Sequence, residues 1–419
     1  MSKRPLAIDL SLYALAALAA GATALWSTLE PHRNWGAIAV GGYAPAAFAL
    51  AMLLAQVGVT WFKRALVAGA TGVAVAAIPL LAQAIEHADG VAGRAQEEVV
   101  VVEDAGRRLL ETGSPYLHAD QIAALPEPLL GYYPYQPAMA LFGVPDAVFG
   151  DHWWSDARIF FMLAAAACLY GAMRLLRGAA GKGTLLRAFQ ASVLLPVCAL
   201  TFATGGDDMP VVCLAVLALA LCSRERWFGA GLAVGAAASL KLFAWPVAVV
   251  LALLVRRRGP ECLRRHLGGF AVPVAVSLLP VLLVDFRGFA DNSVAFGLGH
   301  GVVESPARSP LPGFLIAEYV PFGDLIAPAL LGAAAVLIAA LLWQRPPETA
   351  AGAALWCAAG LSAAFLLMPA TRFGYLLYPA ILLGWWLALR DAAAAAPERA
   401  AAPSGRRSAG PSLLVEWWR

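Results

Sequence analysis

Residues 227–255 read WFGAGLAVGAAASLKLFAWPVAVVLALLV, an apolar run that Lys241 and then Pro246 interrupt near its middle. As one continuous helix the run would extend roughly 43 Å, well beyond the roughly 30 Å of hydrocarbon in a bilayer. Arginines flank both of its ends, in 224–226 and in 256–265. Because basic residues stay on the cytoplasmic side, such a run is expected to enter the membrane and return. We therefore predict a re-entrant pair of short helices that turns at Lys241.

The composition of the whole chain excludes a water-soluble protein. Of its 419 residues 61% are hydrophobic and only 14% are charged, and the mean hydropathy is +0.71. Soluble proteins carry about 25% charged residues. Only helices and closed barrels span a bilayer, and the long runs of Ala, Leu and Val lack the alternation of barrel strands. The sequence predicts an all-α polytopic membrane protein.

Ten further segments are expected to be full spans, because about 20 apolar residues cross a bilayer. They are 7–28, 36–60, 65–85, 157–174, 187–203, 209–222, 268–284, 322–343, 350–368 and 373–389. With the re-entrant pair, most of the 30 lysines and arginines fall on one side, which we predict to be cytoplasmic together with both termini. Long outer loops then occupy 86–156 and 285–321.

Three regions follow from these segments. Residues 1–64 hold two additional N-terminal spans, and residues 65–390 form the main membrane domain. Residues 391–419 are rich in Ala, Pro, Ser and Arg, and we expect a disordered cytoplasmic tail there.

Carboxylates gather in the first outer loop. Its segment DAGRRLLETG, residues 104–113, is predicted to form a short amphipathic helix that stops at Gly113, with Glu98, Glu103 and Asp104 ahead of it or at its start. Acids at a helix N-terminus are common for electrostatic reasons alone. Alternatively, a partly desolvated carboxylate at the membrane boundary acts as a general base.

Two polar motifs on the outer side have two interpretations each. Tyr133 and Tyr135, in GYYPYQP, suit either an interfacial aromatic belt or a platform for a sugar ring. Asp207 and Asp208, in TFATGGDDMP, either cap the next helix or hold a substrate hydroxyl or a cation.

Cationic side chains at membrane depth indicate an anionic partner. A lysine near the bilayer centre costs about 2.5 to 3.5 kcal/mol, so Lys241 needs a counter-charge, and a lipid phosphate is the expected one. Arg372 and Arg308 suit forked hydrogen bonds to phosphate or ordinary interfacial anchoring. His300 lies in the same predicted loop as Arg308 and is either an ordinary loop residue or a ligand of the sugar. The six cysteines show no spacing typical of zinc or disulfides, and no metal or other cofactor is expected.

The order of these pieces resembles glycosyltransferase family 87, a mannosyltransferase-like group with the C-type membrane glycosyltransferase fold. The resembling pieces are EVVVVEDAGRRLLETGSPY (98–116), YYPYQP (132–137), ATGGDDMPVV (203–212) and the Gly-rich run leading to Lys241, within roughly residues 65–390. The sequence departs from the family at Glu98, where an Asp is usual, and at Gly206 and Asp208, where a Gln/Asn pattern is usual.

The resemblance implies transfer of a hexosyl or pentosyl group from a polyprenyl-phosphate carrier to a glycan or glycolipid of the cell envelope. The reaction would be inverting, metal-independent and extracytoplasmic, with no nucleic acid as partner. Glu98 is the implied base, with Asp104 and Glu103 as competitors. The residues then expected around the donor phosphate are Lys241, Arg372 and Arg308, and those around the sugar or the acceptor are Asp207, Asp208, Tyr133, Tyr135 and His300.

Two other functions remain open from the residues. A secondary transporter or lipid flippase would use the broken helix at Lys241 as a midplane site. Such proteins pair ionisable groups within spans, whereas most acids here lie in outer loops. The third possibility is an inactive family member that scaffolds envelope synthesis.

Overall fold

The protein is almost entirely helical in the computed structural model, which describes residues 3–56, 60–296 and 300–395. Within these residues eight helices are long and apolar enough to cross a membrane, or nine if the pair 182–194 and 196–204, bent by 49°, counts as one span. The predicted class, an all-α polytopic membrane protein, is confirmed. The predicted tail, 391–419, lies almost wholly outside the described residues, although the last helix continues into it as far as Ala394.

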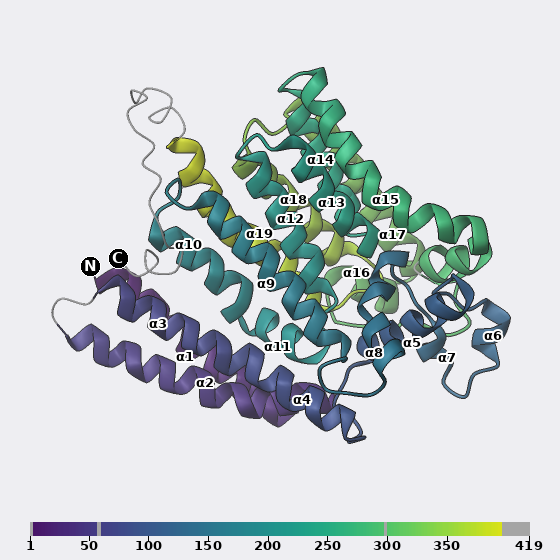
Figure 1. Ribbon diagram of the computed structural model, residues 1–419, viewed down its shortest axis with the longest axis horizontal. Helices are drawn as coiled ribbons and strands as arrows, with labels where there is room; N and C mark the ends of the chain where they lie inside the picture. The colour runs from purple at the N-terminus through teal and green to yellow at the C-terminus, as the bar shows by residue number, and fades with distance from the viewer. Residues whose placement is uncertain (1–2, 57–59, 297–299, 396–419) are drawn as a thin grey trace.

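The N-terminal helices form one side of the molecule (Figure 1). They are α1 (Lys3–Trp26), α2 (Glu30–Ala55), α3 (Trp61–Gly72), the π-helical turn η1 (Val73–Ala77) and α4 (Ile78–Ala88). The indole of Trp35 donates to the carbonyl of Val75 at 2.9 Å, and the hydroxyl of Tyr43 donates to the carbonyl of Leu194 at 2.9 Å. The third span thus packs with the two that precede it in one apolar cluster. The boundary at residue 64 stays a prediction.

The long loop predicted to lie on the outer side contains α5 (Glu97–Thr112), α6 (Ala119–Ala123), α7 (Pro128–Gly131), the 3₁₀ turn η2 (Pro137–Phe142) and α8 (Val144–Phe149). The prediction of a helix over 104–113 was too short, because α5 begins at Glu97. Burial of Val99, Val101 and Val102 against the core outweighs the low helix propensity of β-branched residues. Glu103 and Asp104 therefore lie inside the helix. Gly113 ends it with a φ of 79°, as predicted.

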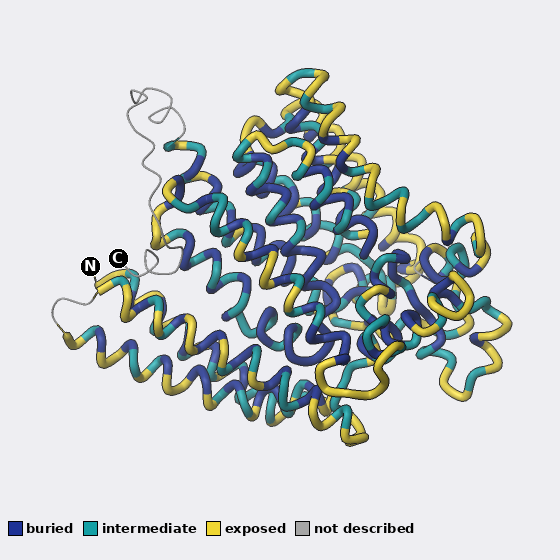
Figure 2. The backbone as a smooth tube through the Cα atoms, viewed as in Figure 1, coloured by how far each residue is buried: buried dark blue, intermediate teal, exposed yellow. Residues whose placement is uncertain are grey.

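The middle of the molecule consists of α9 (Ala157–Leu176), α10 (Lys182–Phe189), η3 (Gln190–Leu194), α11 (Pro196–Thr204) and α12 (Asp208–Cys222). Most of α12 is buried, as the dark central helices of Figure 2 indicate. With 15 residues, α12 extends roughly 22 Å. Among the described residues, eight of the ten predicted spans correspond to helices that are long enough to cross a membrane. The span predicted at 187–203 is the bent pair, and α12 is too short to cross the hydrocarbon alone.

The apolar run around Lys241 is a re-entrant pair, α13 (Trp227–Leu240) and α14 (Ala244–Arg256), followed by α15 (Pro260–Phe289). A Cβ added to Gly231 would collide with His266, and one added to Gly235 would collide with Phe270 and Pro273. The later glycine of α13 thus contacts later residues of α15, so the two helices run parallel. Since α14 connects their opposite ends, it must run back.

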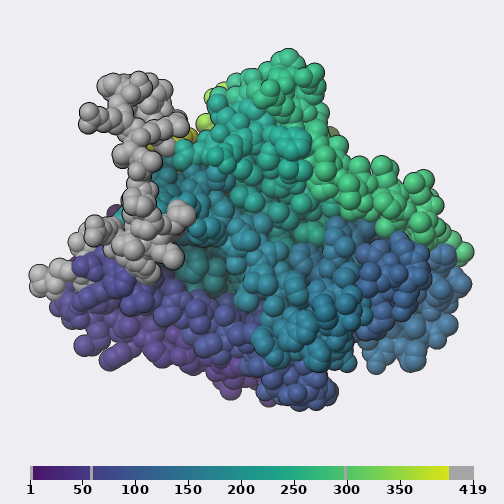
Figure 3. Space-filling model, viewed as in Figure 1, coloured from purple at the N-terminus to yellow at the C-terminus, as the bar shows by residue number. Residues whose placement is uncertain are grey.

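The rest of the chain covers the re-entrant pair. It comprises η4 (Ala290–Ala295), α16 (Pro312–Tyr319), α17 (Gly323–Gln344), α18 (Ala350–Leu367), the 3₁₀ turn η6 (Phe373–Leu376) and α19 (Leu377–Ala394). Helical structure continues to Ala295, so the second outer loop is shorter than the predicted 285–321. Arg257 pairs with Glu348 at 2.9 Å, which places the loops after α14 and after α17 together. In Figure 3 α15 lies on the side opposite the N-terminal helices.

Candidate active site

Lys241 lies at the break between α13 and α14, where its backbone is extended with φ −152° and ψ 144°. Its Nζ donates to Asp207 Oδ2 at 2.8 Å and to Asp208 Oδ1 at 2.5 Å. The hydroxyl of Tyr378 donates to the same Asp208 oxygen at 2.7 Å. The sequence prediction placed a lipid phosphate opposite this ammonium group. The structure instead places two carboxylates of the chain there, and these offset the cost of burying the lysine.

The two aspartates are held by the GGDD turn between α11 and α12. Gly206 has a φ of 87°, which favours glycine, and the Phe161 ring lies 3.0 Å from where its Cβ would be. Asp207 is the N-cap residue of α12, yet its side chain makes no capping hydrogen bond. Capping therefore does not explain Asp207, and both carboxylates point to Lys241.

Aromatic rings surround the ammonium group of Lys241. Its Nζ lies 5.1 Å from the centroid of the Tyr135 ring and 5.8 Å from those of Phe243 and Tyr375. Ring faces attract a desolvated cation. Tyr135 is fixed because its carbonyl accepts hydrogen bonds from Tyr116 at 2.9 Å and from Ser293 at 3.0 Å. Of the two tyrosines predicted to line the site, Tyr135 therefore contacts Lys241.

Tyr133 does not form an exposed platform. Its side chain is fully buried, its ring packs at 5.3 Å against Tyr135, and its hydroxyl donates to the carbonyl of Gln136 at 3.2 Å. Burial raises the pKa of its phenol well above the usual range. In this conformation Tyr133 supports Tyr135 from behind.

Lys241, Asp207 and Asp208 together form the lysine cluster. Glu98 and Arg372 form an ion pair next to it. The pair joins Arg372 Nη1 to Glu98 Oε1, while Glu98 Oε2 is buried and has no hydrogen-bond partner among the described residues. A Cβ on Gly205 would lie 3.8 Å from this Oε2 atom. The side chain of Gln96, two residues before Glu98, accepts a hydrogen bond from Thr204 at 2.7 Å. The start of α5 is therefore attached to the GGDD turn.

Two elements connect the Glu98–Arg372 pair with the lysine cluster. The first is the GGDD turn, which carries Asp207 and Asp208. The second is η6, because the amide of Tyr375 donates to the carbonyl of Arg372 at 3.1 Å while its ring faces Lys241. The structure thus brings six predicted site residues to one place, although they come from distant parts of the chain. These residues are Glu98, Tyr135, Asp207, Asp208, Lys241 and Arg372.

The other predicted carboxylates lie elsewhere. Glu103 Oε1 accepts a hydrogen bond from the amide of Ala157 at 3.0 Å, and its Oε2 lies 3.8 Å from His87 Nε2. Burial raises the pKa of the Glu103 carboxyl, and nearby Asp156 raises it further. Asp104 is exposed and pairs with Arg107 at 3.0 Å. Neither contacts the group around Glu98 and Lys241.

Arg308 and His300 also lie outside this group. The guanidinium of Arg308 pairs with Glu304 and Glu318, each at 2.8 Å. Only its backbone neighbours reach the site region, where the amide of Thr371 donates to the carbonyl of Ala307 at 2.8 Å. The side chain of His300 is exposed.

Four residues that contact Lys241 or adjoin it were not among the predicted site residues. Tyr375, Tyr378 and Phe243 surround the ammonium group or its aspartates. Gln136 is buried beside them. Its backbone amide donates to the carbonyl of Leu240 at 3.1 Å, and its side-chain Nε2 has no hydrogen-bond partner among the described residues. Phe243 lies only two residues after Lys241, on the break itself. No spacing in the sequence indicates the other three contacts, because they arise only when η6, α19 and the chain just before η2 pack on the re-entrant break.

Two solved structures of one protein resemble this chain. The structure of ArnT from Cupriavidus metallidurans bound to undecaprenyl phosphate is similar, with 17% identity and a TM-score of 0.47 over 76% of this chain and 59% of that chain. The apo structure of the same protein has 20% identity and a TM-score of 0.43, over 70% and 54% of the respective chains. This chain therefore spans less than two thirds of ArnT. No curated protein matches it in sequence.

The sequence profile of one family matches residues 133–369, more than half of the chain. The match includes Tyr135, the GGDD turn and the re-entrant pair with Lys241, whereas Glu98 lies well before it and Arg372 just after it. The resemblance found in the sequence is confirmed. This chain belongs to glycosyltransferase family 87.

Proposed function

We propose that this glycosyltransferase moves a sugar from a polyprenyl-phosphate carrier to a glycan or glycolipid of the cell envelope, on the extracytoplasmic face. The observation that carries the proposal is Glu98, whose one oxygen pairs with Arg372 while the other is buried and unpartnered beside the GGDD turn. A base for the acceptor and a cation for the leaving phosphate are the two groups that such a transfer needs.

In the proposed reaction, Oε2 of Glu98 accepts the proton of the acceptor hydroxyl. The hydroxyl oxygen forms a bond to the anomeric carbon as the bond from that carbon to the phosphate oxygen breaks. The electron pair of the broken bond leaves with the carrier phosphate, whose charge Arg372 stabilises. Attack opposite the phosphate inverts the anomeric carbon. Side chains neutralise the monophosphate, so the proposed step uses no metal.

The ion pair couples donor binding to the base. A carrier phosphate at Arg372 competes with Glu98, because both anions bind the same guanidinium N–H groups. When the phosphate occupies Arg372, Glu98 loses a counter-charge and becomes a stronger proton acceptor. The base is therefore activated only with the donor in place.

The lysine cluster suits the sugar better than the phosphate. One ammonium group and the two carboxylates of Asp207 and Asp208 leave a net charge of −1, which disfavours binding of the carrier phosphate there. Carboxylates accept hydrogen bonds from sugar hydroxyls, and the Tyr135 ring offers an apolar face. We assign the aspartates and Tyr135 to the sugar, and Lys241 to holding the aspartates in place.

The test uses purified protein in liposomes with radiolabelled hexosyl and pentosyl polyprenyl phosphates and glycolipid acceptors. We expect transfer by the wild type and loss of transfer in Glu98→Gln and Arg372→Ala. Asp104→Asn and Arg308→Ala are matched controls. Asp104 lies on the same helix as Glu98, and the backbone of Arg308 pairs with that of Thr371, the residue before Arg372, but neither side chain contacts the site. Undiminished transfer in both site variants refutes the assignment. Solute uptake without any transfer would support the transporter instead.

A further inference from the structure

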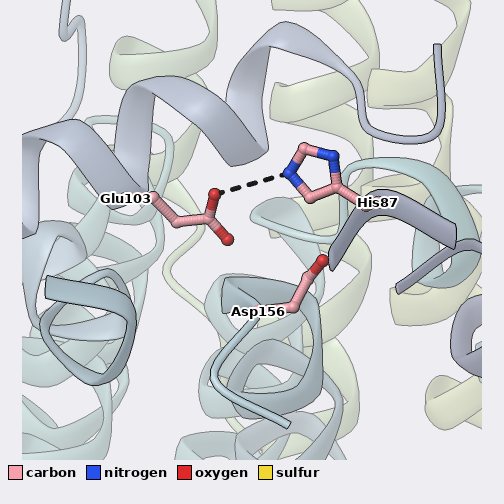
Figure 4. Close-up of side chains that lie close together, drawn as sticks. All are labelled: His87, Glu103 and Asp156. Carbon is pink, nitrogen blue, oxygen red and sulfur yellow. Dashed lines mark ion pairs between the residues drawn. The ribbon is translucent and has the colours of Figure 1, made fainter. Parts of the chain in front are cut away.

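A second cluster of ionisable side chains lies apart from the proposed active site, where three elements meet. His87 comes from the last turn of α4, Glu103 from α5 and Asp156 from the residue before α9 (Figure 4). One ligand atom from each lies within 4.8 Å of those of the other two. Glu103 and Asp156 are buried, with 8% and 4% of their surface exposed. The proposed glycosyl transfer uses none of these residues.

The cluster borders a small cavity of about 120 Å³. Apart from two alanines, its lining consists of imidazoles and carboxylates, namely His87, His152, Glu103, Asp146, Asp151 and Asp156. A water molecule occupies about 30 Å³ in the liquid, so the cavity has room for an ion with one or two waters. The cavity is therefore both large enough and polar enough for a cation.

The charge around the cavity is unbalanced. When all four are ionised, its carboxylates carry −4, and two arginines approach from outside the lining: Arg107 at 3.3 Å from Asp146 and Arg158 at 2.6 Å from Asp156. A charge of −2 remains when both imidazoles are neutral. A divalent cation would balance it, and buried like charges are costly without such a partner.

We propose that His87, Glu103 and Asp156 bind a divalent transition-metal ion, with Zn²⁺ the best match to one imidazole and two carboxylates. This ligand set, completed by water, is typical of zinc, whereas Mg²⁺ and Ca²⁺ prefer oxygen alone. The three ligand atoms lie within 4.8 Å of one another, whereas tetrahedral ligands about 2.0 to 2.2 Å from zinc lie roughly 3.4 Å apart, so the cluster must contract by up to about 1.4 Å. The His87 side chain is one-third exposed, whereas Glu103 and Asp156 are buried.

The buried ligands are already oriented for an ion. Glu103 is held at Oε1 by the amide of Ala157, which leaves Oε2 facing His87. Asp156 receives hydrogen bonds from Arg158 Nε at 2.9 Å and Nη2 at 2.6 Å. Partners that fix a ligand from behind in this way are common around metals and strengthen binding.

The ion would join α4, α5 and α9. Because Glu103 lies on the same helix as Glu98, it would also hold the first turn of α5 in position, as a structural rather than a reacting metal. The proposal does not rest on the glycosyl-transfer mechanism, since binding is measured without any substrate.

The test measures metal content and stability of the full-length protein in detergent. We expect about one equivalent of zinc per chain after dialysis against Zn²⁺, and a Tm that falls on chelation and recovers on Zn²⁺ but not Mg²⁺ addition. His87→Ala and Glu103→Gln should each weaken zinc binding at least about tenfold.

His118→Ala is the matched control, because His118 pairs with Asp285 at 2.9 Å in the same outer region without a third ligand. This variant should bind zinc like the wild type. Equal zinc content in the wild type and in a folded His87→Ala or Glu103→Gln variant would overturn the proposal. So would a wild-type Tm that does not respond to chelation.

Discussion

Arg372 pairs with Glu98 although 274 residues separate them in the chain. The pair joins the first outer helix, α5, to the turn before α19, next to the cluster of Lys241, Asp207 and Asp208. In the proposed reaction the same two side chains supply the base and the phosphate ligand.

Replacement of Glu98 by Gln should remove the base with little change in shape. We expect transfer to fall by about 10²- to 10⁴-fold, the usual contribution of a general base, while donor binding persists or strengthens because Arg372 is released. Turnover and donor affinity are measured separately with labelled donor. Asp104→Asn should keep wild-type turnover. A Glu98→Gln enzyme with normal turnover would show that another group is the base.

Arg372→Lys should retain the positive charge and lose the forked geometry. We expect weaker donor binding and slower transfer than in the wild type, and a larger loss in Arg372→Ala. The measurements are the KM for the donor and kcat. Arg308→Lys provides the comparison, since its guanidinium is bound to Glu304 and Glu318. If Arg308→Lys impairs donor binding more than Arg372→Lys, the assignment of the two arginines is reversed.

Lys241→Met should destabilise the protein by about 3 to 5 kcal/mol, because it leaves two buried carboxylates without their cation. The Tm in detergent measures the loss. Combining Lys241→Met with Asp207→Asn and Asp208→Asn removes the unbalanced charge, so the triple variant should regain much of the stability. It should remain inactive, since the sugar ligands are altered. A single variant as stable as the wild type would contradict the ion cluster.

Gly231→Ala tests the parallel packing of α13 on α15. Alanine normally favours a helix over glycine by about 0.8 to 1 kcal/mol, yet here its Cβ would collide with the carbonyl of His266. We expect a net loss of about 1 to 3 kcal/mol. Gly229→Ala on the same helix meets only Leu221 at 3.7 Å and should be neutral or stabilising. Equal Tm values for the two variants would exclude the described contact.

The predicted sidedness is tested by cysteine labelling in intact cells. An impermeant maleimide should react with Glu127→Cys, in the first outer loop, and should not react with Lys182→Cys before cell lysis. Both side chains are exposed in the structure. Of the native cysteines only Cys262 is partly exposed, on the predicted inner side. The reverse pattern would place the active site in the cytoplasm.

Local composition was enough to predict the membrane class, most of the membrane helices and the break at Lys241. These properties depend on local composition, because apolar length and flanking charge decide how a segment sits in a bilayer. The glycines that allow α13 to approach α15 were visible as a Gly-rich run, although their partner helix was not.

Which polar groups meet depends on the packing of helices that are distant in the sequence. This packing placed Glu98 with Arg372, gave Lys241 two aspartates in place of a phosphate, and separated Glu103 and Asp104 from the site. The sequence also gave no sign of the cluster of His87, Glu103 and Asp156, whose members come from three elements. Such pairings depend on how distant helices pack. Burying an unpaired charge away from water costs so much free energy that packings which pair the charges are favoured.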